Sequence, residues 1–420
     1  MTANIVLVAL DYLRDKDPRR TLGHASILAQ LALCPDIAVV PLEFAVNAPS
    51  FSREEVLAAT LRSIIDDRTY VAIGAYVWND RVVQWLLPEL RRAGFRGRIV
   101  LGGPQISYAP AGIDQIYADA DMFVRGYGEV ALVQLLRGEH PAHGVTWRGS
   151  DDARTRADVD LASLPSPYLN GVLHVSDFVR WETQRGCPYS CAFCQHMESG
   201  AKLRLRKLDP ARIKAEIGFF VAHGVKDIAV LDPVFNDDPE HAVSVLRHFA
   251  ATGYQGRLSL QCRFESVTQE FFEACQSLNV RLEFGLQTTQ RAEMKAIRRT
   301  NNLAKVEAVI AELHRRRIDF EVSLIYGLPE QTLESFKASV DWCVERGVPL
   351  VRAFPLMLLR GTPLERDRAR WGLVENDEPI PLVVQSNTFS RADWDAMRDI
   401  AAELQRHWLR DGELGLWGAS

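Results

Sequence analysis

Short runs of β-forming residues alternate with helical patterns along most of the chain. This alternation constrains the fold strongly, because strands separated by helices pair in parallel and bury both faces of their sheet. In the first part of the chain the expected strands cover residues 5–10, 37–42, 70–77, 98–101 and 122–124, and the expected helices cover 25–33, 53–66, 82–93 and 111–118. The pattern predicts an α/β protein that begins with a doubly wound, Rossmann-like sheet.

The alternation stops near residue 138, where prolines and glycines gather, and then resumes with a longer repeat. Six more strands are expected over 178–184, 227–231, 258–262, 281–286, 319–325 and 350–355, with helices over 210–223, 239–251, 269–277, 303–316 and 333–346. Six such units predict a partial (β/α)6 barrel with its chemistry at the carboxyl ends of the strands. At 420 residues the chain is too long for one ordinary core. We divide it into a domain over 1–137, a linker over 138–176, a barrel over 177–365 and a helical C-terminal extension over 366–420.

The extension carries an amphipathic helix. From Trp394 to Trp408 apolar residues recur every three or four positions, and Ser390 is the expected N-cap of a helix over residues 391–409. The apolar stripe is expected to pack against the barrel, with a role in covering the mouth of the site as the alternative.

The composition is that of a water-soluble globular chain, with 47% hydrophobic and 25% charged residues and a net charge of −5. That balance argues against a nucleic-acid partner and against a polybasic membrane anchor. No apolar stretch approaches the roughly 20 residues of a membrane span, and the apolar opening at residues 5–10 is too short for the core of a signal peptide. We expect a cytoplasmic protein that does not bind membranes, in a compartment where thiols stay reduced.

Three of the seven cysteines, Cys187, Cys191 and Cys194, form a C-x-x-x-C-x-x-C group directly after the first barrel strand. Thiolates are soft ligands that select iron–sulfur clusters or zinc, and three of them leave one iron of a [4Fe–4S] cluster without a protein ligand. Zinc is the weaker alternative, because it usually takes a fourth nearby Cys or His and His196 is badly placed. A disulfide is weaker still, because the group is odd-numbered and no secretory signal is expected.

The cysteine spacing, with aromatic Phe193 before the last cysteine, resembles the signature of the radical S-adenosylmethionine (SAM) superfamily. The resemblance implies that the three cysteines are the metal ligands of a [4Fe–4S] cluster, that SAM chelates the open iron, and that reductive cleavage gives a 5′-deoxyadenosyl radical. It also implies a SAM-binding role for Phe193 and for polar or glycine residues at successive strand ends. These residues are Asp232, Asn236, Arg263, Gln287 and Gly327.

Glycines and polar residues also follow the strands of the first domain. Residues 76–79, 102–105 and 125–129 read YVWN, GGPQ and RGYGE, and ligands of such sheets bind at the carboxyl ends of the strands. Together these stretches resemble the cobalamin-binding domain that precedes the radical domain in cobalamin-dependent radical SAM enzymes. The resemblance implies that Trp78 and Asn79 face the lower side of the corrin. The residues that it places along the nucleotide tail, or that close its pocket, are Gly102, Gly103, Pro104, Gln105, Gly126 and Glu129.

One departure from the cobalamin pattern concerns the metal. The D-x-H-x-x-G motif is absent, since His24 follows Gly23 without an Asp two residues earlier. We expect a cobalt ion without a protein histidine below it; a degenerate domain that binds no cobalamin is the alternative.

The resemblance implies a methyltransferase acting on an unactivated carbon of a small metabolite or natural-product precursor. Its expected cofactors are a [4Fe–4S] cluster, SAM and cobalamin, and a flavodoxin or ferredoxin is the expected reducing partner. No side chain is assigned as a catalytic acid, base or nucleophile, because the cofactors carry the difficult chemistry. Two alternatives stay open. One is a radical SAM cyclase, rearrangement or group-transfer enzyme without methyl transfer; the other is an iron–sulfur sensor or binding module.

Overall fold

The computed structural model describes residues 3–141, 143–198, 201–202 and 205–410, and for 197–198, 201–202 and 407–410 it describes the backbone alone. The chain divides into two compact units, Met1–His174 and Val175–Ser420. No helix in the described part of the chain is both long enough and apolar enough to cross a membrane.

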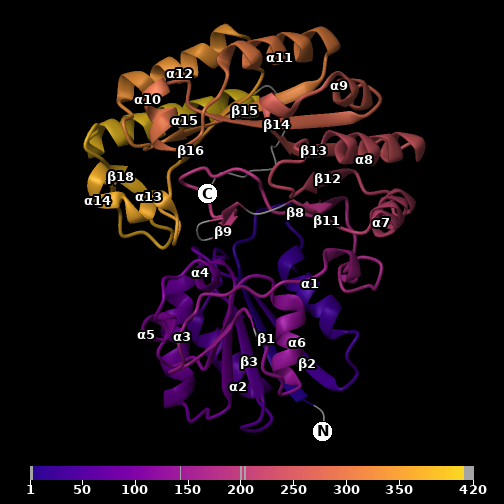
Figure 1. Ribbon diagram of the computed structural model, residues 1–420, viewed down its shortest axis with the longest axis vertical. Coiled ribbons are helices and arrows are strands. Elements are labelled where there is room, and N and C mark those ends of the chain that lie inside the picture. Colours follow the sequence, from indigo (N-terminus) through magenta and orange to yellow (C-terminus); the bar gives the residue numbers. More distant parts are fainter. Residues whose placement is uncertain (1–2, 142, 199–200, 203–204, 411–420) are drawn as a thin grey trace. The chain divides into compact units, whose positions relative to one another are not determined.

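The first unit is a six-stranded sheet with the order β2-β1-β3-β4-β5-β6 (Figure 1). Strands β1 to β5 pair in parallel and β6 runs antiparallel to β5. The strands are β1 (Ala3–Asp11), β2 (Ile37–Ala45), β3 (Tyr70–Gly74), β4 (Arg98–Gly102), β5 (Met122–Val124) and β6 (Val145–Trp147). The helices are α1 (Leu22–Leu31), α2 (Arg53–Ser63), α3 (Asp80–Arg92), α4 (Pro104–Ser107), α5 (Ile113–Ile116) and α6 (Gly128–Leu136), followed by the 3₁₀ turn η1 (Leu161–Ser163).

Strand β1 shows why this sheet is covered on both faces. Its even residues Val6 and Val8 lie in a core with side chains of α2 and α3, whereas Ile5 and Leu7 lie in a second core with α1 and α6. Alternate residues of a strand point to opposite faces, so an apolar run without polar interruption buries both. The predicted doubly wound architecture is confirmed.

Two details of the first unit differ from the expectation. The helix expected over 111–118 shrinks to α5, whose entry at Gly112 takes a left-handed φ of 79°. The stretch expected as a linker, 138–176, is not free of structure, because β6 forms the edge strand of this sheet and Gly126 and Ala157 form a parallel bridge. The four-part division of the chain stays a prediction.

The second unit is a six-stranded, fully parallel sheet in the order β16-β15-β14-β13-β12-β7, which confirms the partial (β/α)6 barrel. Its strands are β7 (Phe178–Trp181), β12 (Asp227–Val230), β13 (Arg257–Cys262), β14 (Asn279–Gln287), β15 (Asp319–Tyr326) and β16 (Val351–Pro355). The helices between them are α7 (Pro210–Ala222), α8 (Pro239–Ala251), α9 (Gln269–Cys275) after the turn η2 (Phe264–Ser266), α10 (Arg291–Ala296), α11 (Leu303–Arg316) and α12 (Leu333–Glu345).

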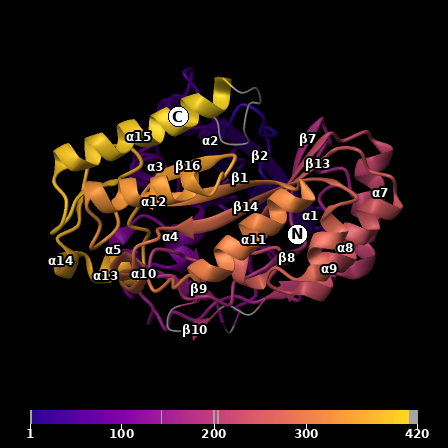
Figure 2. The ribbon, with the colours of Figure 1, turned by 90° about the horizontal axis from the view of Figure 1, so that it is seen from above.

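These helices cover one face of the sheet, and Figure 2 shows them as an arc around the strands. Trp181 of β7 meets Phe220 of α7 edge-on, and Tyr326 of β15 packs on Phe336 of α12. Side chains of the opposite parity, such as Arg180 and Glu321, therefore point to the other side of the sheet. We call that side the inner face.

The cysteine group does not leave β7 directly. Strand β7 ends at Trp181, and β8 (Gln184–Arg185) then pairs antiparallel with β11 (Arg206–Lys207), so the strand expected over 178–184 is interrupted. A further ladder joins β9 (Met197–Glu198) to β10 (Ala201–Lys202). The cysteine loop is thus enclosed between short ladders.

The C-terminal part contains α13 (Pro363–Arg366), α14 (Arg368–Trp371), the antiparallel pair β17 (Val374–Glu375) and β18 (Val383–Gln385), and α15 (Arg391–Arg410). Asp393 N donates to Ser390 Oγ over 3.2 Å, which confirms the expected N-cap. Trp394 is buried and its ring lies 5.8 Å from that of Tyr326, so the apolar stripe begins by packing on β15. The side chain of Trp408, and Trp417, lie outside the described residues.

Candidate active site

The cysteine loop just after Cys191 is fixed by contacts from distant parts of the chain. Ala192 N donates to Ile297 O over 2.8 Å, and Leu364 N donates to Ala192 O over 3.0 Å. The Gln195 side chain donates to Arg360 O over 2.9 Å. Three partners, each about 100 residues or more away along the chain, therefore position this loop.

The three cysteines are free thiols, with Cys187 and Cys191 buried and Cys194 partly exposed. Burial raises the pKa of Cys194 to about 12 and also raises that of Cys187. Such thiols do not ionise at neutral pH unless a metal ion replaces the proton. Among the described residues no three His, Cys, Asp or Glu side chains converge on one metal ion. Ligands of a [4Fe–4S] cluster bind separate irons, so this donor set fits a cluster without such convergence.

Arg299 joins the cysteine loop to the sheet, and the sequence analysis did not identify it. Its Nη1 donates to Cys191 Sγ over 3.7 Å, and its Nη2 donates to Gly285 O on β14. The contact places a positive charge beside this sulfur. Its Nε is buried without a hydrogen-bond partner, as is Gln184 Oε1 just before the loop.

Gln287 ends β14 at a bulge and has a left-handed φ of 70°. An ideal Cβ on Gly285 would lie only 2.6 Å from Gln287 Nε2 and 3.3 Å from Arg299 Nη2. The glycine therefore makes room for both side chains above the inner face. The structure brings the predicted Gln287 next to the group that contacts Cys191.

Arg263 lies after β13, as predicted, and its guanidinium stacks 3.7 Å above the ring of Tyr189 inside the cysteine loop. The Tyr189 hydroxyl donates to Asp237 over 2.6 Å. This arrangement places a cation beside the loop, where it can meet a carboxylate.

The side chains of Asn236 and Asp232 form hydrogen bonds with backbone groups. Asn236 Nδ2 donates to Arg263 O and its Oδ1 accepts from Arg263 N, both over 2.9 Å. Asp232 is fully buried, and its carboxylate accepts from Thr183 N, Thr183 Oγ1 and Gln184 N; burial raises its pKa to about 7. The geometry favours positioning roles for both over the SAM contacts expected for them, and the hydrogen bonds of Asp232 explain why the chain turns after β7.

Gly327 is buried after β15 and has a φ of 89°. An ideal Cβ on this glycine would lie 3.1 Å from Val383 O. Gln331 Oε1 accepts from the backbone N of Gly327 and Leu328 over 2.7 and 3.1 Å. Gln331 Nε2 in turn donates to the buried Glu293 over 3.2 Å. The sequence analysis missed Gln331 and Glu293, although Gln331 stands only four residues after the predicted glycine.

Phe193 lies between Ala192 and Cys194 and is partly exposed. No ring contact to another described aromatic side chain is recorded for it, so its expected place against the adenine stays a prediction.

In the first unit, Asn79 holds the loop that follows β3. Its side chain donates to Leu10 O and Gly74 O over 2.8 and 2.9 Å and accepts from Tyr76 N over 2.8 Å. Trp78 Nε1 donates to Leu10 O, and its partly exposed ring stacks 4.5 Å from that of Tyr76. The pair presents an aromatic surface at the carboxyl edge, while Asn79 itself is buried and positions it.

The glycines after β4 have different roles. Gly103 has a φ of 90°, and a Cβ there would meet Ala75 O at 2.7 Å, whereas a Cβ on Gly102 would find no atom nearer than 3.9 Å. Pro104 begins α4, and the side chain of Gln105 is buried directly after it. The open position at Gly102 leaves space for a ligand tail at this edge.

Gly126 has a φ of 88°, and an ideal Cβ there would lie only 2.5 Å from Ala157 O. The side chain of Glu129 accepts a hydrogen bond from Ser26 Oγ over 3.0 Å. Both close the edge by holding neighbouring segments together. His24, which lacks the cobalt-ligand motif, is buried, and burial lowers its pKa to about 4.

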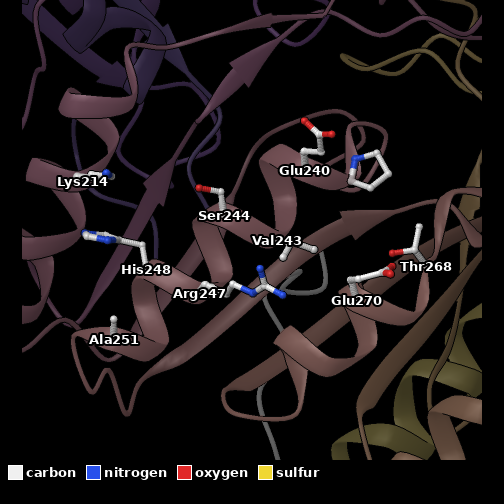
Figure 3. A pocket seen from close by; sticks show the side chains of 10 residues that line it. Lys214, Glu240, Val243, Ser244, Arg247, His248, Ala251, Thr268 and Glu270 are labelled. Carbon is white, nitrogen blue, oxygen red and sulfur yellow. The ribbon is translucent and has the colours of Figure 1, made fainter.

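A groove of about 580 Å³ lies among the covering helices α7, α8 and α9 (Figure 3). Its side chains include Lys214, Glu240, Arg247, His248 and Glu270, and none of the cysteines lines it. Because it lies in the helical layer on the face opposite to the inner face, it is separate from the candidate site.

Comparisons with known proteins agree with this geometry. The family model for the radical SAM superfamily matches residues 181–343. The chain is 27% identical to the cobalamin-dependent radical SAM methyltransferase TokK of Streptomyces tokunonensis over 76% of this chain and 51% of that protein. It is 28% identical to the 2-(S-pantetheinyl)-carbapenam-3-carboxylate methyltransferase of Streptantibioticus cattleyicolor over 79% of this chain and 55% of that protein. The chain thus spans about half the length of these curated relatives.

The fold is also similar to a solved structure of TsrM from Kitasatospora setae, a radical SAM methyltransferase with tryptophan and a SAM analogue bound. The TM-score is 0.73 at 16% identity, with coverage of 96% of this chain and 89% of that one. The cobalamin-dependent SAM radical enzyme OxsB gives a TM-score of 0.71 at 14% identity, over 97% of this chain and 67% of that one.

Proposed function

We propose that this chain, which belongs to the radical SAM family with an N-terminal cobalamin-type domain, is a methyltransferase acting on an unactivated carbon of a small metabolite. One observation carries the proposal: three free cysteines stand at the carboxyl end of a parallel barrel sheet, with Arg299 linking Cys191 to Gly285. The methyltransferase names of the relatives support the reaction class.

The cofactors of the proposal are a [4Fe–4S] cluster, SAM and cobalamin. Cys187, Cys191 and Cys194 would hold the cluster in the second unit. The edge formed by Trp78, Gly102 and Gln105, among others, would hold the corrinoid in the first. When bound, these groups would supply radical chemistry for removing a substrate hydrogen and a methyl group to replace it.

The chain's own residues would bind and orient the cofactors. Arg299 offers positive charge to a ligand sulfur, and Arg263, stacked on Tyr189, offers a two-point partner to the SAM carboxylate. Gln287, next to Arg299, offers an amide to a ribose hydroxyl. Asp232, Asn236, Gln331 and Glu293 fix the loops that carry these groups.

The partners are a small-molecule substrate and a reducing protein of the flavodoxin or ferredoxin class. An electron must reach the cluster for each SAM cleavage, and the reducing protein would supply it. The proposal includes no nucleic-acid partner, in keeping with the net charge of −5.

A substrate-free experiment tests the proposal. The anaerobically reconstituted protein is given reductant and SAM with a deuterated methyl group, and 5′-deoxyadenosine and the extracted cobalamin are analysed by mass spectrometry. We expect reductant-dependent 5′-deoxyadenosine and a trideuteromethyl group on cobalamin.

The alternative functions predict different products in this experiment. 5′-Deoxyadenosine without labelled cobalamin would support a non-methylating radical enzyme. Formation of neither product would leave an iron–sulfur sensor or binding module and reject the proposal.

A further inference from the structure

The inner face of β14–β16 changes character along the strands. Near the carboxyl end, Ile325 and Phe354 are register partners, and both are partly exposed. One row deeper Gly285 pairs with Ser323, and a further row deeper Glu283 pairs with Glu321. The row nearest the carboxyl end is therefore apolar, Arg352 continues the Gly285–Ser323 row on β16, and the row below pairs two carboxyl groups.

Most charged side chains of this face have a partner of opposite charge. Arg281 Nε lies 2.8 Å from Asp319 Oδ2, and Arg352 Nε lies 3.2 Å from Glu321. These ion pairs satisfy Asp319 and Glu321. They leave Glu283 as the carboxyl group to be explained.

Glu283 has no hydrogen bond or ion pair with any residue that the structure describes. The residue is recessed and keeps partial exposure. Burial, and next the charge of Glu321, raise its pKa to about 8, against the opposing effect of Arg352, Arg281 and Arg180. A recessed carboxyl group beside a second carboxylate attracts either a proton or another cation.

The position of Glu283 relative to the cysteine loop suits a substrate. Gly285 O accepts from Arg299, which also donates to Cys191 Sγ. Glu283 is two residues earlier on the same face, about 7 Å along the strand at ~3.3 Å per residue. A molecule whose hydrocarbon part lies beside Ile325 and Phe354 would place a polar end at this depth.

We propose that Glu283 binds a cationic group of the substrate, a protonated amine, and so orients the substrate's hydrocarbon part toward the cysteine loop. This inference rests on the proposed function, which it deepens by giving the substrate an amine. An anionic substrate would instead need the arginines of this face, of which Arg281 and Arg352 already pair with Asp319 and Glu321.

Ligand-observed saturation-transfer NMR at neutral pH and fixed ionic strength tests the inference on the holoenzyme. The probes are n-butylammonium, n-butanol and butyrate at equal millimolar concentrations. The variants are Glu283→Gln, which keeps the shape but cannot take a negative charge when an amine binds, and Glu283→Asp, which keeps a carboxyl group. Ser259→Ala, at a deeper position of the same face, is the matched control.

We expect n-butylammonium to bind the wild type in preference to the other probes. Binding should weaken about tenfold or more in Glu283→Gln, be partly kept in Glu283→Asp and be unchanged in Ser259→Ala. Preferred binding of butyrate, or equal binding of n-butylammonium by wild type and Glu283→Gln, would overturn the inference. If Glu283→Gln does not fold, the wild-type preference among the probes decides.

The two proposals fail in different ways. Substrate-free formation of 5′-deoxyadenosine by the wild type tests the proposed function and does not need an amine. Normal 5′-deoxyadenosine with no preference for n-butylammonium would reject the role of Glu283 alone.

Discussion

The two carboxyl edges of the molecule are held in place by different means. In the first unit one side chain, Asn79, makes most of the side-chain hydrogen bonds that fix the loop after β3, to Leu10, Gly74 and Tyr76, and Trp78 adds one more to Leu10. In the second unit the cysteine loop is held from many places, because the chain near residues 297, 299, 360 and 364 contributes separate contacts.

The difference indicates where each edge is vulnerable. An edge that depends on one buried polar residue should lose its shape when that residue is removed. An edge held by distributed contacts should keep its shape after most single changes, so its function should depend on the metal ligands themselves.

The largest effect is expected from Cys191→Ala. The variant should fold, because the loop keeps its backbone anchors at Ala192, but it should lose the cluster and all reductant-dependent cleavage of SAM. Iron analysis and 5′-deoxyadenosine formation measure both. Cys343→Ala, a change at a buried cysteine on α12, is the control and should keep its iron. Normal cleavage by Cys191→Ala would contradict the assignment.

Asn79→Ala should clearly destabilise the first unit. It removes three hydrogen bonds of a buried side chain, and we expect the free energy of unfolding to fall by about 2–4 kcal/mol. Urea unfolding followed by fluorescence measures this. Asn47, an exposed residue with two hydrogen bonds to Leu13, is the control, and Asn47→Ala should cost about 1 kcal/mol or less. Equal losses would show that the β3 loop does not depend on Asn79.

Substitutions at the two neighbouring glycines after β4 distinguish two effects. One is a change in backbone conformation, and the other is the filling of space that a ligand needs. Gly103→Ala should lower stability by about 1–3 kcal/mol, because its φ of 90° is left-handed and a Cβ would meet Ala75 O. Gly102→Ala should leave the melting temperature unchanged and weaken the binding of added cobalamin, because its Cβ would occupy open space. Unchanged cobalamin affinity in a folded Gly102→Ala protein would remove Gly102 from the site.

The smallest effect is a slope of stability with pH. The folded-state pKa of Glu283 is raised from 4.5 to about 8, so the native state keeps a proton that the unfolded chain has lost. Stability should therefore fall as pH rises from about 5 to 8. Glu283→Gln should flatten this part of the curve in denaturant titrations at several pH values. A slope identical to that of the wild type would contradict the raised pKa.

Much of the fold could be predicted because it depends on local patterns. The expected helices over 239–251 and 303–316 match α8 and α11 at both ends, since Pro239 and Asn302 mark where they begin and glycine or arginine follows their ends. Strand order in the barrel follows chain order, so alternation alone was enough to predict it.

The roles of the site residues were harder to predict. Asp232 and Asn236 stand at the predicted strand ends, but whether they contact a ligand or a backbone depends on Thr183 and Arg263, which are 49 and 27 residues away. Arg299 approaches Cys191 across 108 residues, and no spacing signal connects them. The interrupted strand after β7 has the same origin, because Asp232 binds Thr183 and Gln184 and turns the chain there.

The central claim is that three cysteines hold a cluster in the second unit while the first unit holds a corrinoid. Metal analysis of anaerobically purified protein, with its visible spectrum, tests the claim most directly. The account predicts about four irons and one cobalt per chain, with iron lost in Cys191→Ala and cobalt kept. Zinc in place of iron, or no metal at the cysteines after reconstitution, would contradict it.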